Sequence, residues 1–179
     1  KLDILVNNVG GVEKFGDFFD LADQDWKQTF NLNVMPIIYF VRNAFPLLRK
    51  SKSGRIINIS SISGVQPGIH NPHYTITKAA CINLSKILAN QFSPERILVN
   101  VVCPGPVHSG SWEKNIIDFA KIKDISVERA RIDFENKEVK KIPLGRIGEG
   151  EDLAGLVAFL ASDKASWITG ACFHINGGK

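Results

Sequence analysis

The 179-residue sequence is poor in cysteine and in long apolar runs, and each shortage excludes a class of protein. Its three cysteines, Cys81, Cys103 and Cys172, have spacings that fit neither a disulfide framework nor a metal site. Each stands among apolar neighbours, which predicts buried free thiols in a reducing compartment, and we expect a cytoplasmic protein. No apolar run approaches the ~20 residues of a membrane-spanning helix, so we expect no membrane partner.

Charge of one sign is not concentrated anywhere in the chain. The 22 Lys and Arg residues exceed the 18 Asp and Glu residues by four, and a mild basic excess at 137–141 is interleaved with Glu135 and Glu138. This pattern is typical of a solvated face and argues against a nucleic-acid partner. Hydrophobic residues make up 44% of the chain, and repeats are absent. We therefore expect one globular domain over residues 1–179.

Four short apolar runs predict buried strands. They are LDILV (2–6), RIINISS (55–61), ILVNVVCPGPV (97–107) and ACFHINGG (171–178). Helical periodicity fills the segments between them, at 20–49, 70–92, two charged pieces within 111–142, and 151–161. Strands that alternate with such helices indicate right-handed βαβ units and a doubly wound parallel sheet of the α/β class.

Three residues predict local features of these helices. Pro36 lacks the N–H that would bond the Leu32 carbonyl, so the helix over 20–49 should kink there. Pro72 suits the first turn of the helix over 70–92. Ser126 fits the N-cap position of the second charged piece.

Three of the predicted strands end in polar or turn-forming residues: NNVG (7–10), SSISG (60–64) and PGPVHS (104–109). Ligands of open parallel sheets bind outside the carboxyl ends of the strands, so these segments should border one crevice. The helix with Tyr74 and Lys78 begins shortly after the second segment and should rise beside the same crevice. Positions i and i+4 share a helix face, which places the lysine next to the tyrosine.

A phenol beside an ammonium group suits general acid–base chemistry. Lowering the pKa of a tyrosine from near 10 to roughly 7 takes about 4 kcal/mol. A lysine ~4 Å away supplies an energy of that order at an effective dielectric constant of about 20. We therefore predict a lowered pKa for Tyr74 and proton exchange with a substrate oxygen. From spacing alone, an ordinary surface helix is the alternative interpretation.

The sequence resembles the short-chain dehydrogenase/reductase family over nearly its whole length. LVNNVG, NLNV, NISS, YTITK and PGPVHS match the family's motifs in order, and SDKASWITGACFHINGG resembles the end of its 3-oxoacyl-acyl-carrier-protein reductase-like branch. Two departures concern turns and leave the polar groups of catalysis untouched. Val9 replaces the usual alanine, and Asn176 stands where aspartate is usual.

The resemblance implies an oxidoreductase that interconverts a ketone and a secondary alcohol by hydride transfer, with NAD or NADP as cofactor and a small carbonyl or alcohol substrate. It assigns catalysis to Asn33, Ser61, Tyr74 and Lys78. It assigns cofactor contacts to Tyr74 and Lys78 and also to Asn8, Gly10, Pro104, Gly105, Val107 and Ser109. The histidines near the crevice, at positions 70, 73 and 108, are expected to line the pocket and to bind no metal.

Two alternative functions stay open. An epimerase or dehydratase of the family's extended branch shares Tyr-x-x-x-Lys, although the Pro-Gly segment and the C-terminal pattern argue against it. A non-catalytic nucleotide-sensing or scaffold relative usually lacks one of the Tyr, Lys or Ser residues, and all three are present here. Residues 111–142 are interpreted as a substrate lid, or else as an ordinary surface helix pair, and their apolar face suggests an apolar or acyl substrate.

Two further expectations concern assembly and the start of the chain. The helices near 26–49 and 72–92 are too apolar to cover only one sheet face, so we expect the homodimer or homotetramer common in the family. The family's Gly-rich turn, which cradles the pyrophosphate, is absent, as are the residues that choose between NAD and NADP. The strand at 2–6 should be central in a whole fold, so we expect about 70–80 residues, with three strands, upstream of Lys1.

Overall fold

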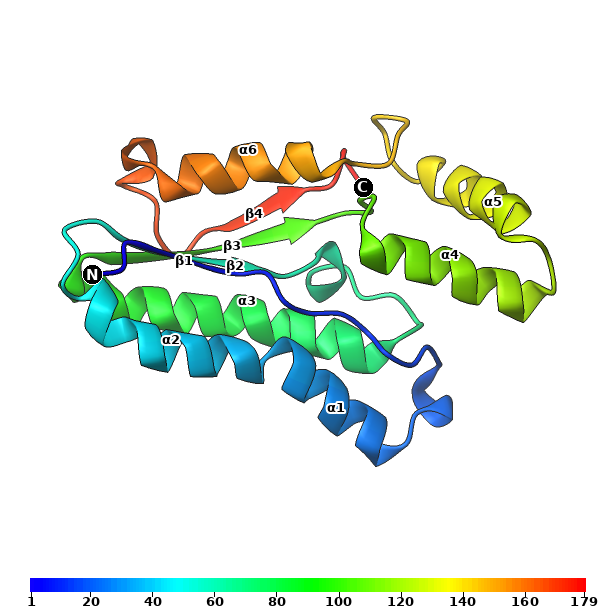
Figure 1. The fold of residues 1–179 in the computed structure, drawn as a ribbon, viewed down its shortest axis with the longest axis horizontal. Helices are drawn as coiled ribbons and strands as arrows, with labels where there is room; N and C mark the ends of the chain where they lie inside the picture. The colour runs from blue at the N-terminus through cyan, green and yellow to red at the C-terminus, as the bar shows by residue number, and fades with distance from the viewer.

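The computed structural model describes all of residues 1–179, as a four-stranded sheet with helices on both faces (Figure 1). The strands pair in chain order, and every pairing is parallel, which confirms the predicted sheet. Their bounds are β1 (Ile4–Asn7), β2 (Gly54–Ile59), β3 (Ile97–Pro104) and β4 (Cys172–Ile175).

Six α-helices connect the strands, close to the predicted positions. Their bounds are α1 (Asp23–Asn33), α2 (Met35–Leu48), α3 (Pro72–Phe92), α4 (Gly110–Lys123), α5 (Val127–Val139) and α6 (Gly150–Ala161). Single turns of 3-10 helix add η1 (Phe18–Asp20), η2 (Ile62–Gly64), η3 (Ser93–Glu95) and η4 (Asp163–Ala165). No helix combines the length and the apolar character needed to cross a membrane.

The predicted kink near Pro36 is a complete break between two helices. α1 ends at Asn33, and α2 begins with Pro36 in its first turn, where the missing proline N–H costs no helical hydrogen bond. The Asn33 carbonyl instead accepts a hydrogen bond from the Cys81 thiol of α3, at 3.3 Å. The break leaves the Asn33 side chain buried at a helix end, where it can serve the loop after β1.

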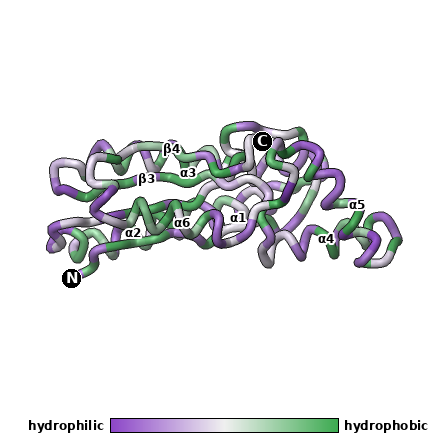
Figure 2. The backbone as a smooth tube through the Cα atoms, turned by 90° about the horizontal axis from the view of Figure 1, so that it is seen from above, coloured by the Kyte–Doolittle hydropathy of each residue, from purple (hydrophilic) through white to green (hydrophobic).

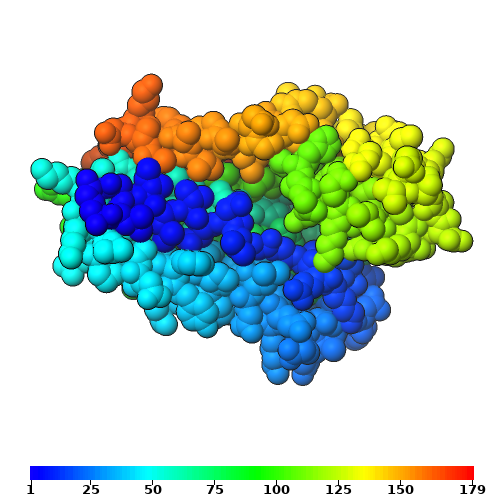
Figure 3. Space-filling model, viewed as in Figure 1, coloured from blue at the N-terminus to red at the C-terminus, as the bar shows by residue number.

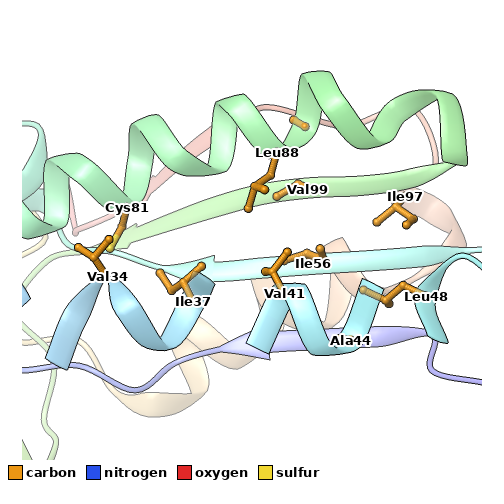
Figure 4. Packing of buried hydrophobic residues seen from close by; sticks show 11 residues of the cluster. Val34, Ile37, Val41, Ala44, Leu48, Ile56, Cys81, Leu88, Ile97 and Val99 are labelled. Carbon is orange, nitrogen blue, oxygen red and sulfur yellow. The ribbon is translucent and has the colours of Figure 1, made fainter. Parts of the chain in front are cut away.

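The largest apolar core lies between the sheet and the pair α2–α3 (Figure 4). Side chains of a strand alternate between faces, so Ile56 of β2 and Ile97 and Val99 of β3 point to this pair. Helix α2 contributes Ile37, Val41, Ala44 and Leu48, α3 contributes Cys81, Leu88 and Ala89, and Val34 joins them from the junction of α1 and α2. Burial of each large aliphatic side chain stabilises the fold by about 1.5–3 kcal/mol, which holds α3 in place.

Helix α6 covers the opposite face of the sheet. Ile57, Ile59 and Val102 point to that face and pack with Leu160 of α6. The chain moves from β3 to the adjacent β4 in the same direction as in its earlier crossovers, but by way of the other face. That crossover therefore has the opposite hand to the two before it. The expectation of uniformly right-handed units is wrong at this point.

Helices α4 and α5 form a hairpin beyond the carboxyl ends of β3 and β4 (Figure 1). Ser109 and Ser126 cap their N-termini by accepting hydrogen bonds from the Trp112 and Arg129 amides, so the predicted cap at Ser126 is confirmed. Polar and apolar stretches alternate along both helices (Figure 2). The apolar face of α4 packs into a small core of the hairpin, made of Trp112, Ile116, Ala120, Ala130, Ile142 and Ile147.

The three cysteines differ from the prediction in one respect. All are free, and Cys81 and Cys103 are buried, but Cys172 is exposed because it lies on the edge strand β4. The Sγ atoms of Cys103 and Cys172 lie 3.4 Å apart, although 69 positions separate them in the chain. Burial, together with this neighbour, raises the pKa of the Cys103 thiol to about 12.

Candidate active site

A cavity of about 600 Å³ opens where β2 and β3 end, as expected for a parallel sheet. Its lining comes from the turn after β2, the first turn of α3, the loop after β3, and the hairpin α4–α5. An adjoining hollow reaches the loop after β1 and shares Tyr74 with the cavity. The loop after β1 and α4 lie side by side on the surface (Figure 3), and Lys114 Nζ contacts the carbonyls of Val12 and Glu13.

Lys78 lies buried behind Tyr74, on the same face of α3, and lines neither the cavity nor the hollow. Its ammonium donates a hydrogen bond to the Ile59 carbonyl at 3.3 Å and lies 5.6 Å from the centre of the Tyr74 ring. Burial lowers the pKa of Lys78, since a desolvated ammonium loses stability relative to the neutral amine. Two of its three donors have no protein acceptor, so it can still bind a ligand.

The Tyr74 hydroxyl differs from the prediction in its acidity. Burial raises the pKa of Tyr74, and the Ser61 side chain opposes that rise only in part. The lysine ammonium stands over the ring face, 5.6 Å from the ring centre, and does not lower the pKa of Tyr74. The predicted lowering of the Tyr74 pKa is therefore wrong for this chain, and the hydroxyl keeps its proton at neutral pH.

Ser61 lies two residues after the end of β2 and caps the turn η2. Its hydroxyl accepts a hydrogen bond from the Ser63 amide at 3.1 Å and donates to the Ser63 hydroxyl at 3.2 Å. Ser61, Ser63 and Tyr74 all line the cavity. Its neighbour Ser60 is buried and donates to the Lys78 carbonyl at 2.7 Å. Of the two adjacent serines, only Ser61 lines the cavity.

The side-chain amide of Asn33 forms all of its hydrogen bonds with backbone groups. Its Oδ1 accepts from the Gly11 amide at 3.0 Å, and its Nδ2 donates to the carbonyls of Gly11 and Thr29 at 2.8 and 2.9 Å. A Cβ placed on Gly10 would stand 2.7 Å from Asn33 Oδ1 and 3.0 Å from Lys78 Nζ. Asn33, Gly10 and Lys78 therefore meet at one point, where glycine lets the loop approach the ammonium.

The loop after β3 is held close to β4 and to the start of α6. Gly105 donates to the Ile175 carbonyl, and its own Cβ would stand 2.9 Å from Asn176. Val107 pairs with Gly148 in an isolated bridge. Gly105, Val107 and Ser109 line the cavity, and Ser109 also caps α4. Pro104 ends β3 just outside the lining.

Asn8 lies outside the site, whereas the neighbouring Asn7 has a structural role. Asn8 is exposed and lines neither the cavity nor the hollow, which the loop after β1 borders through later residues such as Gly10 and Phe15. The preceding Asn7 is buried and donates to Asn58 at 2.7 Å, and Asn58 donates to Ser85 of α3 at 2.8 Å. This chain of hydrogen bonds ties β1, β2 and α3 together. The sequence signal for this hydrogen-bond chain is an asparagine near the end of each of the first two predicted strands, since Asn7 and Asn58 are paired in the sheet.

The histidines occupy three different settings. His70 lines the cavity and pairs with Asp17, and His108 contacts the carboxylates of Glu149 and Glu135 at 2.7 and 3.4 Å. His73 is buried with its Nε2 3.2 Å from the Lys14 carbonyl, and burial lowers its pKa. Of the three, only His70 lines the cavity. No three acidic, His or Cys side chains converge as a metal site would require.

The residues around the cavity and the adjoining hollow fit a nicotinamide cofactor. The Gly10 backbone leaves open the space that a side chain would fill beside Lys78, and Lys78 has donors free for hydroxyl acceptors such as those of a ribose. On the other side, the loop from Gly105 to Ser109 offers a hydroxyl and backbone groups to an amide. These groups have the chemistry needed to hold the nicotinamide end, and the chain shows no pyrophosphate cradle.

Comparisons with known proteins agree with this geometry. A family model described as "Enoyl-(Acyl carrier protein) reductase" matches residues 1–179. The 3-oxoacyl-[acyl-carrier-protein] reductase FabG of Aquifex aeolicus is 33% identical over 177 residues, which are 99% of this chain and 65% of the relative. The chain thus spans slightly less than two thirds of that relative's length. The expectation of further strands upstream stays a prediction.

Solved structures give the same result for the fold. A short-chain dehydrogenase family protein from Francisella tularensis subsp. tularensis SCHU S4 is similar with a TM-score of 0.89 at 32% identity, covering 98% of this chain and 70% of that one. An NADPH-bound short-chain oxidoreductase from Pseudomonas aeruginosa PAO1 is similar with a TM-score of 0.82 at 30% identity, covering 98% and 65%. The predicted Rossmann-type fold is confirmed.

Proposed function

Because the chain belongs to the short-chain dehydrogenase/reductase family, we propose that it carries the catalytic part of an NAD(P)-dependent reductase that interconverts a ketone and a secondary alcohol. The observation that carries this proposal is the placement of Tyr74 beside Ser61 in the cavity lining, with the buried Lys78 5.6 Å from the centre of the Tyr74 ring. A nicotinamide cofactor supplies the hydride when it is bound.

Tyr74 is proposed as the general acid. Because burial raises its pKa, the hydroxyl holds a proton at neutral pH and can give it to a carbonyl oxygen as that oxygen gains negative charge. Proton transfer by a positioned side chain contributes typically about 10²–10⁴-fold to a rate. A protonated phenol is the form that the reduction of a ketone requires.

Ser61 and Lys78 support that step in different ways. The Ser61 hydroxyl, which lines the cavity beside Tyr74, is proposed to hydrogen-bond the same substrate oxygen and to fix its position. The ammonium of Lys78 would hold the cofactor ribose with its free donors and return a proton towards Tyr74. Asn33 would act through position alone, since its amide holds the Gly11 backbone next to Lys78.

The names of relatives bear on the substrate. The Aquifex aeolicus relative is named a 3-oxoacyl-[acyl-carrier-protein] reductase, and the Pseudomonas aeruginosa structure is described as NADPH-bound. We propose NAD or NADP as cofactor and a small carbonyl compound or its alcohol as substrate. Residues 111–142, whose two helices line the cavity, are proposed as a lid within a single domain.

The exposed surface of α2 and α3 supports a proposal of self-association. Large apolar side chains are exposed on these helices at Tyr39, Phe40, Leu47, Ile76 and Ile87. A groove of about 430 Å³ between the helices is lined by Phe45, Leu84 and Phe92, among others. Exposed apolar patches of this kind mark interaction sites. We propose a homodimer or homotetramer, and a monomer in light scattering at micromolar concentration would contradict it.

The test of the function is turnover with a panel of ketones, followed by absorbance at the reduced-nicotinamide band. Consumption of the reduced cofactor with formation of the alcohol supports a reductase. Binding of the cofactor without turnover of any ketone would favour the nucleotide-sensing alternative. A product that differs from its substrate only in configuration, or by loss of water, would favour the epimerase or dehydratase alternative.

A further inference from the structure

The cavity beside Tyr74 has one wall with a polar stripe. Ser111, Asn115 and Asp118 stand at positions i, i+4 and i+7 of α4, so they share one helix face, and all three line the cavity. Ser111 and Asn115 also line the adjoining hollow. At 1.5 Å of rise per residue, the stripe is about 10 Å long, which matches a small molecule and its substituents.

The protein does not use these polar groups itself. Their neighbours on α4 are engaged, since Lys114 contacts the loop after β1 and Glu113 is held by Arg131 in two hydrogen bonds of 2.7 and 2.6 Å. The half-buried amide of Asn115 has no protein partner. It offers two donors and an acceptor, which is the combination that binds a hydroxyl or a pair of adjacent hydroxyls.

The charge of the wall discriminates against anions. Asp118 is only 28% exposed, and its one ionic contact is with the exposed Lys121 at 3.7 Å, beyond hydrogen-bond distance. Glu138, the other carboxylate of the lining, is held by Lys141 at 2.5 Å and by Lys179 at 2.8 Å. Lys179 is the one lysine of the lining, and this ion pair already occupies its charge. The carboxylate of Asp118 is therefore free to accept hydrogen bonds from hydroxyl groups and repels a carboxylate or phosphate.

Aromatic rings stand beside the stripe. Trp112, Phe119 and Phe134 line the cavity, with ring centres 4.9 Å apart for Trp112–Phe134 and 5.7 Å apart for Phe119–Phe134. A saturated ring with several hydroxyls has C–H groups on its faces and O–H groups around its edge. Such a molecule fits aromatic rings on one side and amide and carboxylate oxygens on the other, as binding sites combine apolar lining with a few placed polar groups.

Most of the aliphatic side chains of α4 are not available to a long acyl chain. Ile116 and Ala120 are buried in the core of the hairpin, Ile117 is absent from the cavity lining, and only Ile122, near the end of the helix, lines the cavity. The interpretation of this face as a binding surface for an acyl group therefore holds for the aromatic residues and Ile122. The rings of Trp112 and Phe119 pack on Phe134 of α5, so the space that they leave in the cavity is compact.

We propose that the substrate is an uncharged, polyhydroxylated ring ketone or its alcohol, of monosaccharide or cyclitol size, with hydroxyl groups bound by Asn115 and Asp118. The proposal rests on the proposed function, because it takes the substrate carbonyl to Tyr74 and Ser61. Asn115 and Asp118 are specificity-determining residues here, and they take no part in the proton transfer.

The test compares two ketones that share a six-membered ring with an acyclic ketone. Reduction of 2,3,4,5,6-pentahydroxycyclohexanone is measured against cyclohexanone and against the acetoacetyl thioester of N-acetylcysteamine, for the wild type and for Asn115→Leu and Asp118→Asn. Asn136→Leu, an exposed change on α5 outside the lining, is the matched control. Calorimetric titration with myo-inositol gives a second readout that needs no turnover.

The wild type should prefer the hydroxylated ketone to cyclohexanone in kcat/KM by about 100-fold or more, because buried polar groups left unpaired penalise the plain ring. Each variant should reduce that preference about tenfold and weaken myo-inositol binding, and Asn136→Leu should change neither. Preference for cyclohexanone or the thioester, or an unchanged preference in Asn115→Leu, would overturn the inference and leave the reductase standing. Turnover of none of the three ketones would overturn both.

Discussion

Gly64 lies directly against the backbone of Lys78. A Cβ at position 64 would stand 2.7 Å from the Lys78 carbonyl carbon, 2.8 Å from the Ala79 amide nitrogen and 2.9 Å from the Lys78 oxygen. The turn after β2 and the helix α3 therefore touch backbone to backbone at the level of the lysine. That contact sets the distance between Ser61 and Tyr74, which come from these two elements.

Gly64→Ala should consequently damage both stability and activity. The methyl group must push the turn away from α3, and overpacking of this kind typically costs about 1–3 kcal/mol. Thermal unfolding and turnover report the two effects. Gly68→Ala is the matched control, because a Cβ there meets no atom within 4 Å. Equal melting temperatures for the two variants would show that the contact carries no constraint.

Tyr74→Phe should lower turnover by about 10²–10⁴-fold while cofactor affinity stays near that of the wild type, because only the proton donor is lost. Lys78→Met should damage both, since its ammonium is proposed to hold the cofactor. Fluorescence titration with the reduced cofactor separates binding from turnover. Substantial activity in Tyr74→Phe would remove the tyrosine from the mechanism.

The buried His73 should make stability depend on pH in the acid range. Burial lowers its pKa below the ordinary value of 6.5, so the unfolded chain binds more protons than the folded one as the pH falls through 6.5. The stability that the neutral, buried His73 contributes is fully present above pH 6.5. It is lost as the pH falls through the lowered pKa of His73 in the folded state. Urea unfolding between pH 7 and 5 should therefore show a steeper loss for the wild type than for His73→Gln. Parallel curves would refute this reading.

Only one of the three thiols should react readily with a thiol reagent in the folded protein. Cys172 is exposed, whereas Cys81 and Cys103 are buried and burial raises the pKa of both, to about 12 for Cys103. The thiolate is the reacting form, so the buried pair stays inert at neutral pH. Mass analysis should find one label per chain before unfolding and three after. Cys172→Ser should remove the first label.

The hairpin of α4 and α5 should exchange its amide hydrogens faster than α6 when no ligand is present. It packs through its own small core, while α6 packs directly on the sheet, and a lid is drawn from the less stable part of a fold. Hydrogen exchange followed by mass spectrometry resolves the two regions. Protection of residues 111–142 equal to that of α6 would argue against a lid.

Local spacing in the sequence was enough to predict much of the site. The i, i+4 relation places Lys78 next to Tyr74 on any helix, and short apolar runs ending in Asn, Ser or Pro-Gly place three loops at one edge of a parallel sheet. Pro36 and Ser126 act within a few residues of themselves, so a break and a cap could be located from the chain alone. These features depend on backbone geometry that neighbouring residues determine.

Tertiary packing decided the rest, because it depends on which atoms surround a group. The pKa of Tyr74 is raised where spacing to Lys78 predicted a lowered one, since the protein interior desolvates both side chains. Asn33 binds the Gly11 amide, and Gly64 packs against the Lys78 backbone, because folding brings separate segments of the chain together. The apolar side of α4 turned to α5, which left Asn115 and Asp118 to the cavity. No periodicity along one helix can determine which neighbour its faces meet.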